Sequence, residues 1–449
     1  MVLDVNNGIP SIYRRYHRGA IRFSQFLLLL LLFTGWFAVA TDKPLTLQQA
    51  TDLALKNDAG LEHLQLAEAS ANEQSVAAGQ LPDPVVKLGL LNLPTDTFAL
   101  DQEPMTQFRI GLIQQFPPGN TLGIRSEQVY LKGQVNRLLR VDRYLQIRRD
   151  VQHLWLEIDF WQQNQSVLNE DRALFEQLIE VTQSLYGVGR VNQQDVLSAE
   201  LELSRLRDRV LTAQMRELEF RAQLGRWIGF ENKLRPLKHA ADDWTIPAAD
   251  HMESALLTHP QIRLQDLEID SSGKQLELAQ QEYKPQWSAE IGYGRRDGEN
   301  PDGSSRPDFL SAAVSIQLPL FTGKRQDKKT RAAQLTQEAA RYQRQDLLLG
   351  LKAQVDLEIQ RERKFRQRAS HFQREIIPMA HAQSVASRNS YRADTAPFAD
   401  LVRAALQVQQ LRLELLNIVR QQRQTIVRLQ YLLPQKLPDQ FSDFPHTTD

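Results

Sequence analysis

The chain has 449 residues, no cysteine, and equal numbers, 54 each, of basic (Lys and Arg) and acidic (Asp and Glu) residues. This balance argues against nucleic-acid binding, which calls for a strongly basic domain. The lack of cysteine excludes disulfides and metal–thiolate sites, and no cysteine-linked lipid anchor is expected. Outside a few junctions rich in Gly and Pro, the commonest residues are Leu, Gln, Arg, Glu and Ala. This composition is typical of long helices with one face in water.

The first forty residues have the layout of a secretory signal peptide. Several arginines precede an apolar run over residues 26–37, and residues 38–40 form an A-x-A cleavage signal. The apolar run is shorter than the ~20 residues that a spanning helix needs, which favours cleavage over a membrane anchor. No other stretch reaches that length, so a mature chain that crosses a membrane is expected to do so with strands. Without residues 1–40, which hold four Arg and one Asp, 50 basic residues stand against 53 acidic ones.

The rest of the chain runs twice through the same order of segments. Pro84 recurs as Pro285, 201 residues later, and Asp195 recurs as Asp400, 205 residues later. We interpret this spacing as an internal duplication. The expected domains are the signal peptide, the first repeat, an equatorial linker, the second repeat and a C-terminal tail, over residues 1–40, 41–229, 230–249, 250–433 and 434–449.

In the first repeat, hydrophobic periodicity predicts helices and strands with clear ends. Thr46 is the expected N-cap of the first helix, and a run without proline predicts a later helix of roughly 100 Å. The predicted order is helix, strand, loop, strand, long helix and return helix, over residues 46–80, 86–91, 93–106, 108–116, 121–185 and 193–228.

The sequence of the second repeat predicts the same order of strands and long helices as that of the first. Its long helix contains Pro378, which is expected to kink it near its far end. Helices of this length do not fit a compact globule, so we expect a coiled-coil-like wall. The predicted strand, loop, strand, long helix and return helix cover residues 287–294, 295–308, 310–318, 324–390 and 398–433.

The strands alternate with period two. On the third strand Trp287 and Ile291 face one way, while Ser288 and Glu290 face the other. Such segments of about ten residues fit the wall of a membrane barrel, although an amphipathic hairpin on a soluble core gives the same pattern. The signal peptide, the duplication and the aromatic residues at strand ends favour the barrel.

With this order of elements, the chain resembles the TolC-type outer-membrane efflux proteins, also called outer-membrane factors. The resemblance rests on the duplicated layout and on a helix-turn motif, Tyr186-Gly187-Val188-Gly189 followed by Asp195-Val196-Leu197, which recurs as Tyr391-Arg392-Ala393 followed by Asp400-Leu401-Val402. It implies a mainly α fold with a small β part. Four strands from each of three subunits form a transmembrane β-barrel of twelve strands, and the long helices form a hollow α-barrel.

The implied function is a passive homotrimeric duct in the outer membrane of a Gram-negative bacterium, in contact with its lipid. A periplasmic adaptor (membrane fusion) protein and an inner-membrane pump of the RND or ABC type are the implied partners, and drugs or heavy-metal ions the implied cargo. A type I protein-secretion duct and a periplasmic coiled-coil scaffold remain alternatives. No His pair with i, i+4 spacing, zinc-ligand cluster, G-x-S-x-G motif or Walker loop occurs, so we expect no enzyme activity, cofactor or metal site.

The resemblance also places the two turns at a closed periplasmic tip. Three copies of Asp195 and Asp400 around an axis are expected to favour cations, although first-turn residues stabilised by the helix dipole are a simpler interpretation. Asp394 stands where the family has Gly, which leaves the adaptor contact of the second turn open. Val188 and Gly189 are expected to meet the adaptor. The residues expected to hold the tip shut are Tyr186, Arg190, Tyr391 and Arg392.

Overall fold

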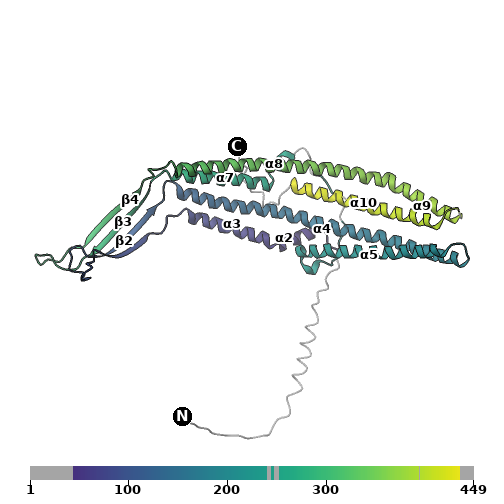
Figure 1. The fold of residues 1–449 in the computed structure, drawn as a ribbon, viewed down its shortest axis with the longest axis horizontal. Helices are drawn as coiled ribbons and strands as arrows, with labels where there is room; N and C mark the ends of the chain where they lie inside the picture. Colours follow the sequence, from purple (N-terminus) through teal and green to yellow (C-terminus); the bar gives the residue numbers. More distant parts are fainter. Residues whose placement is uncertain (1–43, 240–243, 247–251, 394, 435–449) are drawn as a thin grey trace, which may run out of the picture.

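The computed structural model describes residues 44–239, 244–246, 252–393 and 395–434. The predicted signal peptide, the tail beyond residue 434 and Asp394 lie outside these ranges. Within them the chain is a long, curved body, with a sheet at one end and paired helices along the rest (Figure 1). None of the described helices combines the length and the apolarity that crossing a bilayer requires.

The sheet contains two antiparallel hairpins, one from each repeat, in the order β1-β2-β3-β4. The hairpins join where β2 pairs with β3, with Gly111 opposite Gly292 and the rings of Phe116 and Trp287 stacked at 4.0 Å. The predicted alternation is confirmed, since Trp287 and Ile291 are exposed on one face while Gly292 is buried on the other. The strands are β1 (Val85–Leu91), β2 (Gln107–Phe116), β3 (Gln286–Arg295) and β4 (Phe309–Gln317).

The first helix begins at the predicted cap, but it is two helices rather than one. Thr46 caps α2 (Leu47–Asn57), and α3 (Ala59–Ala78) starts again after an extended residue, Asp58. The Asp58 carboxylate accepts a hydrogen bond from the backbone N–H of Leu61 (2.9 Å) and pairs with Arg143 (2.7 Å). Burial alone raises the pKa of Asp58, but the hydrogen bonds from Arg143 and Leu61 outweigh it and lower that pKa. The prediction of one helix over 46–80 is therefore wrong, because a capping carboxylate held by a distant arginine starts a second helix.

The long helices follow the predicted layout closely. α4 (Thr121–Gly187) has 67 residues, and α5 (Gln193–Ile228) and α10 (Phe398–Leu432) return from the tip. The second long helix is not one regular helix: α8 (Gln326–His371) passes through a π turn into α9 (Ile377–Arg392). The π turn, residues 372–376, lies next to Pro378, whose ring clashes with the carbonyl four residues earlier in a regular helix. The kink that the sequence predicts at Pro378 therefore takes the form of a π turn within the long helix.

The helices form a layer around α4 (Figure 1). α3 and α5 pack along one side of α4, and α7 (Pro260–Gln281) and α10 along the other. α8 lies beyond α7 and α10, and α9 continues it beside α10. A single chain thus has two open helical edges, α3 with α5 and α8 with α9, as well as two open strand edges, β1 and β4. Two shorter elements among the described residues are α6 (Met252–Leu257) and the 3₁₀ turn Phe230–Asn232.

Residues 230–239 of the linker pack against the first repeat, whereas the carbonyl of Thr245 accepts a hydrogen bond from Gln430 of α10 (3.3 Å). Leu45 and Leu237 form a parallel bridge, with Leu45 N–H donating to the carbonyl of Pro236 (2.7 Å). His239 lies 2.7 Å from the buried carboxylate of Asp159 on α4. These contacts attach the linker to the helical layer beside α4.

Candidate gate at the helical tip

The two helix-to-helix turns at the end of the layer have matching backbone hydrogen bonds. The N–H of Arg190 donates to the carbonyl of Leu185, and that of Thr395 donates to the carbonyl of Ser390, each at 2.9 Å. Both bonds span five residues and stand 205 residues apart, as the duplication predicts. Gly189 has a φ of +75°, the left-handed conformation that ends many helices and that glycine adopts without strain. The first turn is therefore a Schellman-type C-cap.

The two aspartates of the repeated motif occupy equivalent positions, as the third residue of α5 and of α10. Asp195 accepts a long hydrogen bond from the backbone N–H of Asn192 (3.4 Å). Asp400 pairs with Arg403 at 2.8 Å, with both side chains largely in solvent. Within one chain both carboxylates therefore have the helix-start geometry of the simpler interpretation, and their grouping around an axis stays a prediction.

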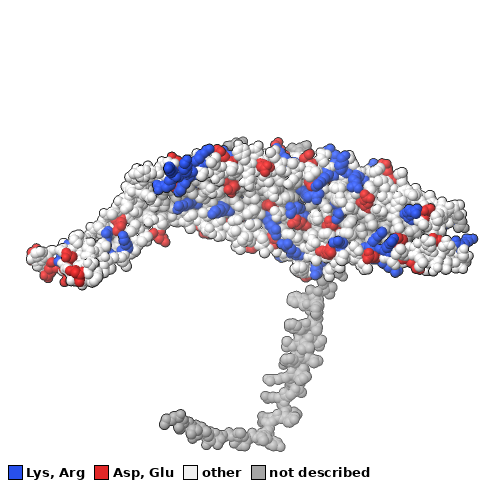
Figure 2. Space-filling view, in the orientation of Figure 1, with Lys and Arg blue, Asp and Glu red and all other residues white. Residues whose placement is uncertain are grey.

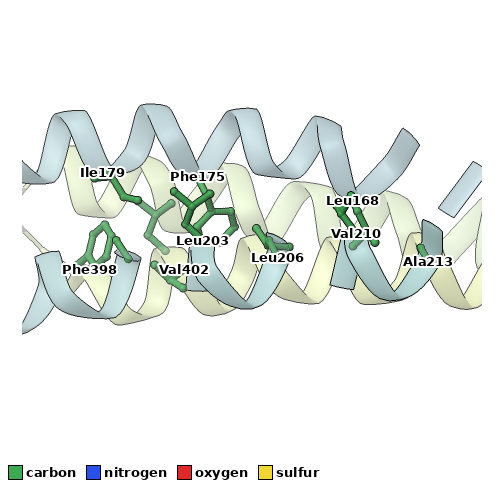
Figure 3. Packing of buried hydrophobic residues seen from close by; sticks show 11 residues of the cluster. Leu168, Phe175, Ile179, Leu203, Leu206, Val210, Ala213, Phe398 and Val402 are labelled. Carbon is green, nitrogen blue, oxygen red and sulfur yellow. The ribbon is translucent and has the colours of Figure 1, made fainter. Parts of the chain in front are cut away.

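An apolar cluster joins the two hairpins just behind the turns (Figure 3). Phe398 and Val402 at the start of α10 lie against Ile179 of α4 and Leu203 of α5. Tyr391 packs on this cluster from the end of α9, edge-on to Phe398 with ring centroids 5.6 Å apart. Of the predicted tip residues, Tyr391 is thus the one whose ring helps to hold the hairpins together.

Four of the other predicted tip residues expose their side chains to solvent. Tyr186 and Val188 are 48% and 70% exposed, and Arg190 and Arg392 are exposed as well. Over the described ranges, the side chains of Tyr186, Arg190 and Arg392 make no hydrogen bond or ion pair. They are therefore free to meet another chain, and their role in holding the tip shut stays a prediction.

Polar contacts between the hairpins were missed from the sequence. Arg209 of α5 donates to Gln409 of α10 (2.9 Å), and Arg412 of α10 pairs with Glu170 of α4 (2.7 Å). Beside them Asp171 is partly buried, and this burial raises its pKa although Arg412 opposes the shift. The partners are 200 and 242 residues apart, so no local pattern indicates them. They tie one repeat to the other above the tip.

In the part of the chain that the structure describes, no three His, Asp or Glu side chains gather as a metal site. The polar face of the sheet carries one ion pair, Arg109 with Glu290 at 2.9 Å, and Arg109 also donates to Ser311 (3.0 Å). Arg109 crosses β3 at Gly292, where a Cβ atom would lie 2.7 Å from its Nε. The glycine thus makes room for a charged pair on the face opposite the apolar residues.

Residues 252–434, which cover the second repeat, match the family model described as outer membrane efflux protein. The second repeat is therefore similar in sequence to this family. The fold likeness extends to both repeats, since three solved structures of similar shape each cover 86% of the chain. No curated protein matches the chain by sequence.

The solved structures share the fold of this chain at low sequence identity. CusC is 14% identical with a TM-score of 0.74 over 91% of its own chain. The outer membrane protein VceC from Vibrio cholerae is 15% identical with a TM-score of 0.72 over 95%. The Campylobacter jejuni CmeC outer membrane channel is 13% identical with a TM-score of 0.71 over 85%. These similarities confirm the predicted fold of the family, with long helices and a four-stranded sheet in each chain.

Proposed function

We propose that three copies of this chain form a passive export duct, with the sheets in the outer membrane and the helices across the periplasm. The observation that carries this proposal is the incompleteness of the single chain. Both helical edges and both strand edges are open, and each edge displays apolar side chains or unpaired backbone groups.

The α5 edge carries two apolar stripes rather than one. One stripe packs on α4 and α10 and contains Leu203, Leu206 and Val210. The other stripe points into solvent with heptad-like spacing, and its side chains are 51% to 63% exposed. A helix with apolar residues on two sides is expected to have neighbours on two sides. This second stripe, the α5 stripe, contains Leu197, Leu201, Leu211, Met215 and Leu218.

The opposite edge also has an apolar stripe, on the sheet half of α8 (Figure 1). Its side chains are 47% to 72% exposed and recur every seven or eight residues: Leu335, Tyr342, Leu349 and Leu357. The α8 stripe lies at the height of α3, whose Leu66 and Val76 are 60% and 63% exposed (Figure 1). The α5 stripe lies at the height of α9, whose Met379 and Val385 are 69% and 45% exposed. One edge of each copy can therefore pack on the other edge of the next. Such head-to-tail contacts close into a ring when the rotation from one subunit to the next is a whole fraction of 360°.

The exposed apolar face and the open edges of the sheet also favour an assembly of three copies. Its apolar face is exposed, for example Leu88 at 63%, Leu310 at 76% and Val314 at 66%. In lipid, unpaired N–H and C=O groups at β1 and β4 are costly, so the edges must pair with neighbouring copies. Three sheets of four strands give twelve strands, an even number in the usual range for bacterial barrels. This exposed face disfavours the periplasmic scaffold, which offers nothing to cover it.

The partners and cargo follow from the family rather than from any residue of this chain. A periplasmic adaptor and an inner-membrane pump of the RND or ABC type would open the tip and supply the energy. Drugs, heavy-metal ions and, in the type I secretion alternative, an unfolded protein are the cargo classes. A duct of this kind needs no catalytic group, so we propose no enzyme activity.

The proposal is tested by the mass and conductance of the purified protein. We expect a trimer in detergent and a small, mostly closed conductance after reconstitution into planar bilayers. A stable monomer in detergent, or a trimer recovered from the soluble periplasm without conductance, contradicts the proposal.

Variants at the tip test the gate. Arg190→Ala combined with Tyr391→Phe is expected to raise the resting conductance several-fold, because both changes remove hydrogen-bonding groups from the tip. Asp195→Ala combined with Asp400→Ala is expected to shift the reversal potential in a salt gradient toward lower cation preference. Arg363→Ala, an exposed charge far from both turns, is the control. If conductance and selectivity are unchanged in the two double variants, these residues do not form the gate.

A further inference from the structure

The junction between β4 and α8 combines exposed apolar side chains with a dense group of basic ones. Leu318, Leu320 and Phe321 are 59%, 72% and 87% exposed, and Phe321 is the most exposed large apolar residue among those described. Figure 2 shows Lys and Arg atoms gathered over the start of α8, next to the strands. Five exposed basic residues follow Phe321 within ten positions, and we call them the basic junction: Lys324, Arg325, Lys328, Lys329 and Arg331.

Nearby acids neutralise only part of this charge. Lys329 pairs with Glu282 at 2.8 Å, and Asp327 accepts a hydrogen bond from the hydroxyl of Tyr283 (2.6 Å). Among the described residues, the amino groups of Lys324 and Lys328 have no ion pair or hydrogen bond. Two cationic groups, Lys324 just before α8 and Lys328 on its first turn, therefore lack a partner within the described residues.

The position of the junction indicates what meets it. Leu318 and Leu320 continue the outward alternation of Leu310, Val314 and Ile316 on β4, so they belong to the face that the proposed function places in lipid. The bilayer's hydrocarbon ends there, and a headgroup layer of about 5–7 Å begins. Residues 326–331 rise about 8 Å along α8, and Lys324 and Arg325 lie just before it. The basic junction therefore spans the layer in which lipid phosphates lie.

The equivalent junction of the first repeat lacks this feature. Between β2 and the start of α4, residues 117–124 contain Pro, Gly, Asn, Thr, Leu and Ile, and the first charges are Arg125 and Glu127. The fold therefore does not require basic residues at the junction between strand and long helix, since the first repeat has none over residues 117–124.

We propose that the basic junction binds the phosphate groups of anionic phospholipids in the periplasmic leaflet of the outer membrane. Leu320 and Phe321 lie among the acyl chains, while Lys324 and Lys328 reach the headgroup phosphate, as long cationic side chains do at membrane interfaces. This inference rests on the proposed function, because it takes the apolar sheet face to be in lipid. Three such sites, alternating with three uncharged junctions, fix the depth of the trimer in the membrane.

The test is an equilibrium titration of the full-length, detergent-solubilised trimer with fluorescent phosphatidylglycerol, with fluorescent phosphatidylethanolamine as the comparison. Each lysine near an anionic surface contributes about fivefold in affinity. Lys324→Gln with Lys328→Gln is therefore expected to weaken phosphatidylglycerol binding about 25-fold and to leave the zwitterionic lipid unaffected. Added salt should weaken binding by the natural chain more than by the variant. Arg363→Gln with Lys364→Gln removes the same charge about 60 Å further along α8 and should change nothing.

The outcomes separate this inference from the proposed function. If the natural chain binds the two lipids with equal affinity, the lipid site is overturned. The same holds if the Lys324→Gln, Lys328→Gln variant binds phosphatidylglycerol as tightly as the natural chain. In both cases the trimer and its conductance are expected to remain. Displacement of the lipid by millimolar inorganic phosphate would assign the site to free phosphate and also overturn it. A protein that is not a trimer and does not conduct fails the proposed function instead.

Discussion

A chain in which Leu211 and Met215 are both replaced by aspartate is expected to fold but not to assemble. These two side chains are 63% and 51% exposed in the single chain, so charges there cost the monomer little. In the proposed ring both are buried against the end of α8 and the start of α9 of the next copy. Burying a side chain of this size completely stabilises by about 2 kcal/mol. Because these side chains are a little over half exposed, six copies per trimer contribute about 7 kcal/mol before the cost of burying six carboxylates.

The measurement is the mass of the purified protein by light scattering, together with its helical content by circular dichroism. We expect a monomer of unchanged helicity and no conductance. The matched control is Phe230→Asp with Leu234→Asp, because these side chains are equally exposed, at 65% and 66%, but lie outside the α5 stripe. Trimers in both double variants would show that the α5 stripe is not an assembly surface.

Arg420→Ala is expected to lower the free energy of unfolding by about 3–5 kcal/mol, the range for removing one partner of a buried ion pair. Arg420 of α10 donates to both carboxylate oxygens of Glu157 on α4 at 2.7 Å. Gln424 donates to the same carboxylate at 2.6 Å, and the Glu157 side chain is 6% exposed. The variant therefore leaves a buried carboxylate with one neutral donor, in a contact that joins the two repeats.

Arg403→Ala is the control for this prediction. It also removes an arginine from α10 and breaks an ion pair at 2.8 Å, but the partners Asp400 and Arg403 are 44% and 75% exposed. Solvent screens such a pair, so we expect a change within about 0.5 kcal/mol. The quantity to compare is the denaturant midpoint at equal slope. Equal midpoints for the two variants would mean that the Glu157 pair does not hold the repeats together.

The elements that depend on local pattern were predicted from the sequence almost to the residue. α5 begins and ends at the predicted Gln193 and Ile228, because a capping motif and a glycine mark its ends. α4 was predicted to within two residues of its end, since no proline interrupts it. The break at Asp58 was missed, because the arginine that holds its carboxylate stands 85 residues away.

The same limit applies to the tip. The two turns were predicted because Tyr186 and Asp195 recur at a fixed offset as Tyr391 and Asp400. The contacts that join the hairpins, such as Arg209 with Gln409, were not predicted. Which exposed side chain of one repeat meets which of the other depends on how the helices lie side by side, and hydrophobic period does not determine this.

The sequence by itself determined the duplication, the strand alternation and the long helices, because each follows from interactions between residues close together in the chain. Only the tertiary structure decided which helices are edges, which apolar stripes stay uncovered and where cationic groups collect beside them. These features depend on packing between segments about 200 residues apart, as in the pairing of β2 with β3, and on which side of each helix that packing leaves open. The open edges then carry the argument for assembly, because apolar surface and unpaired strands left by one chain require another copy to cover them.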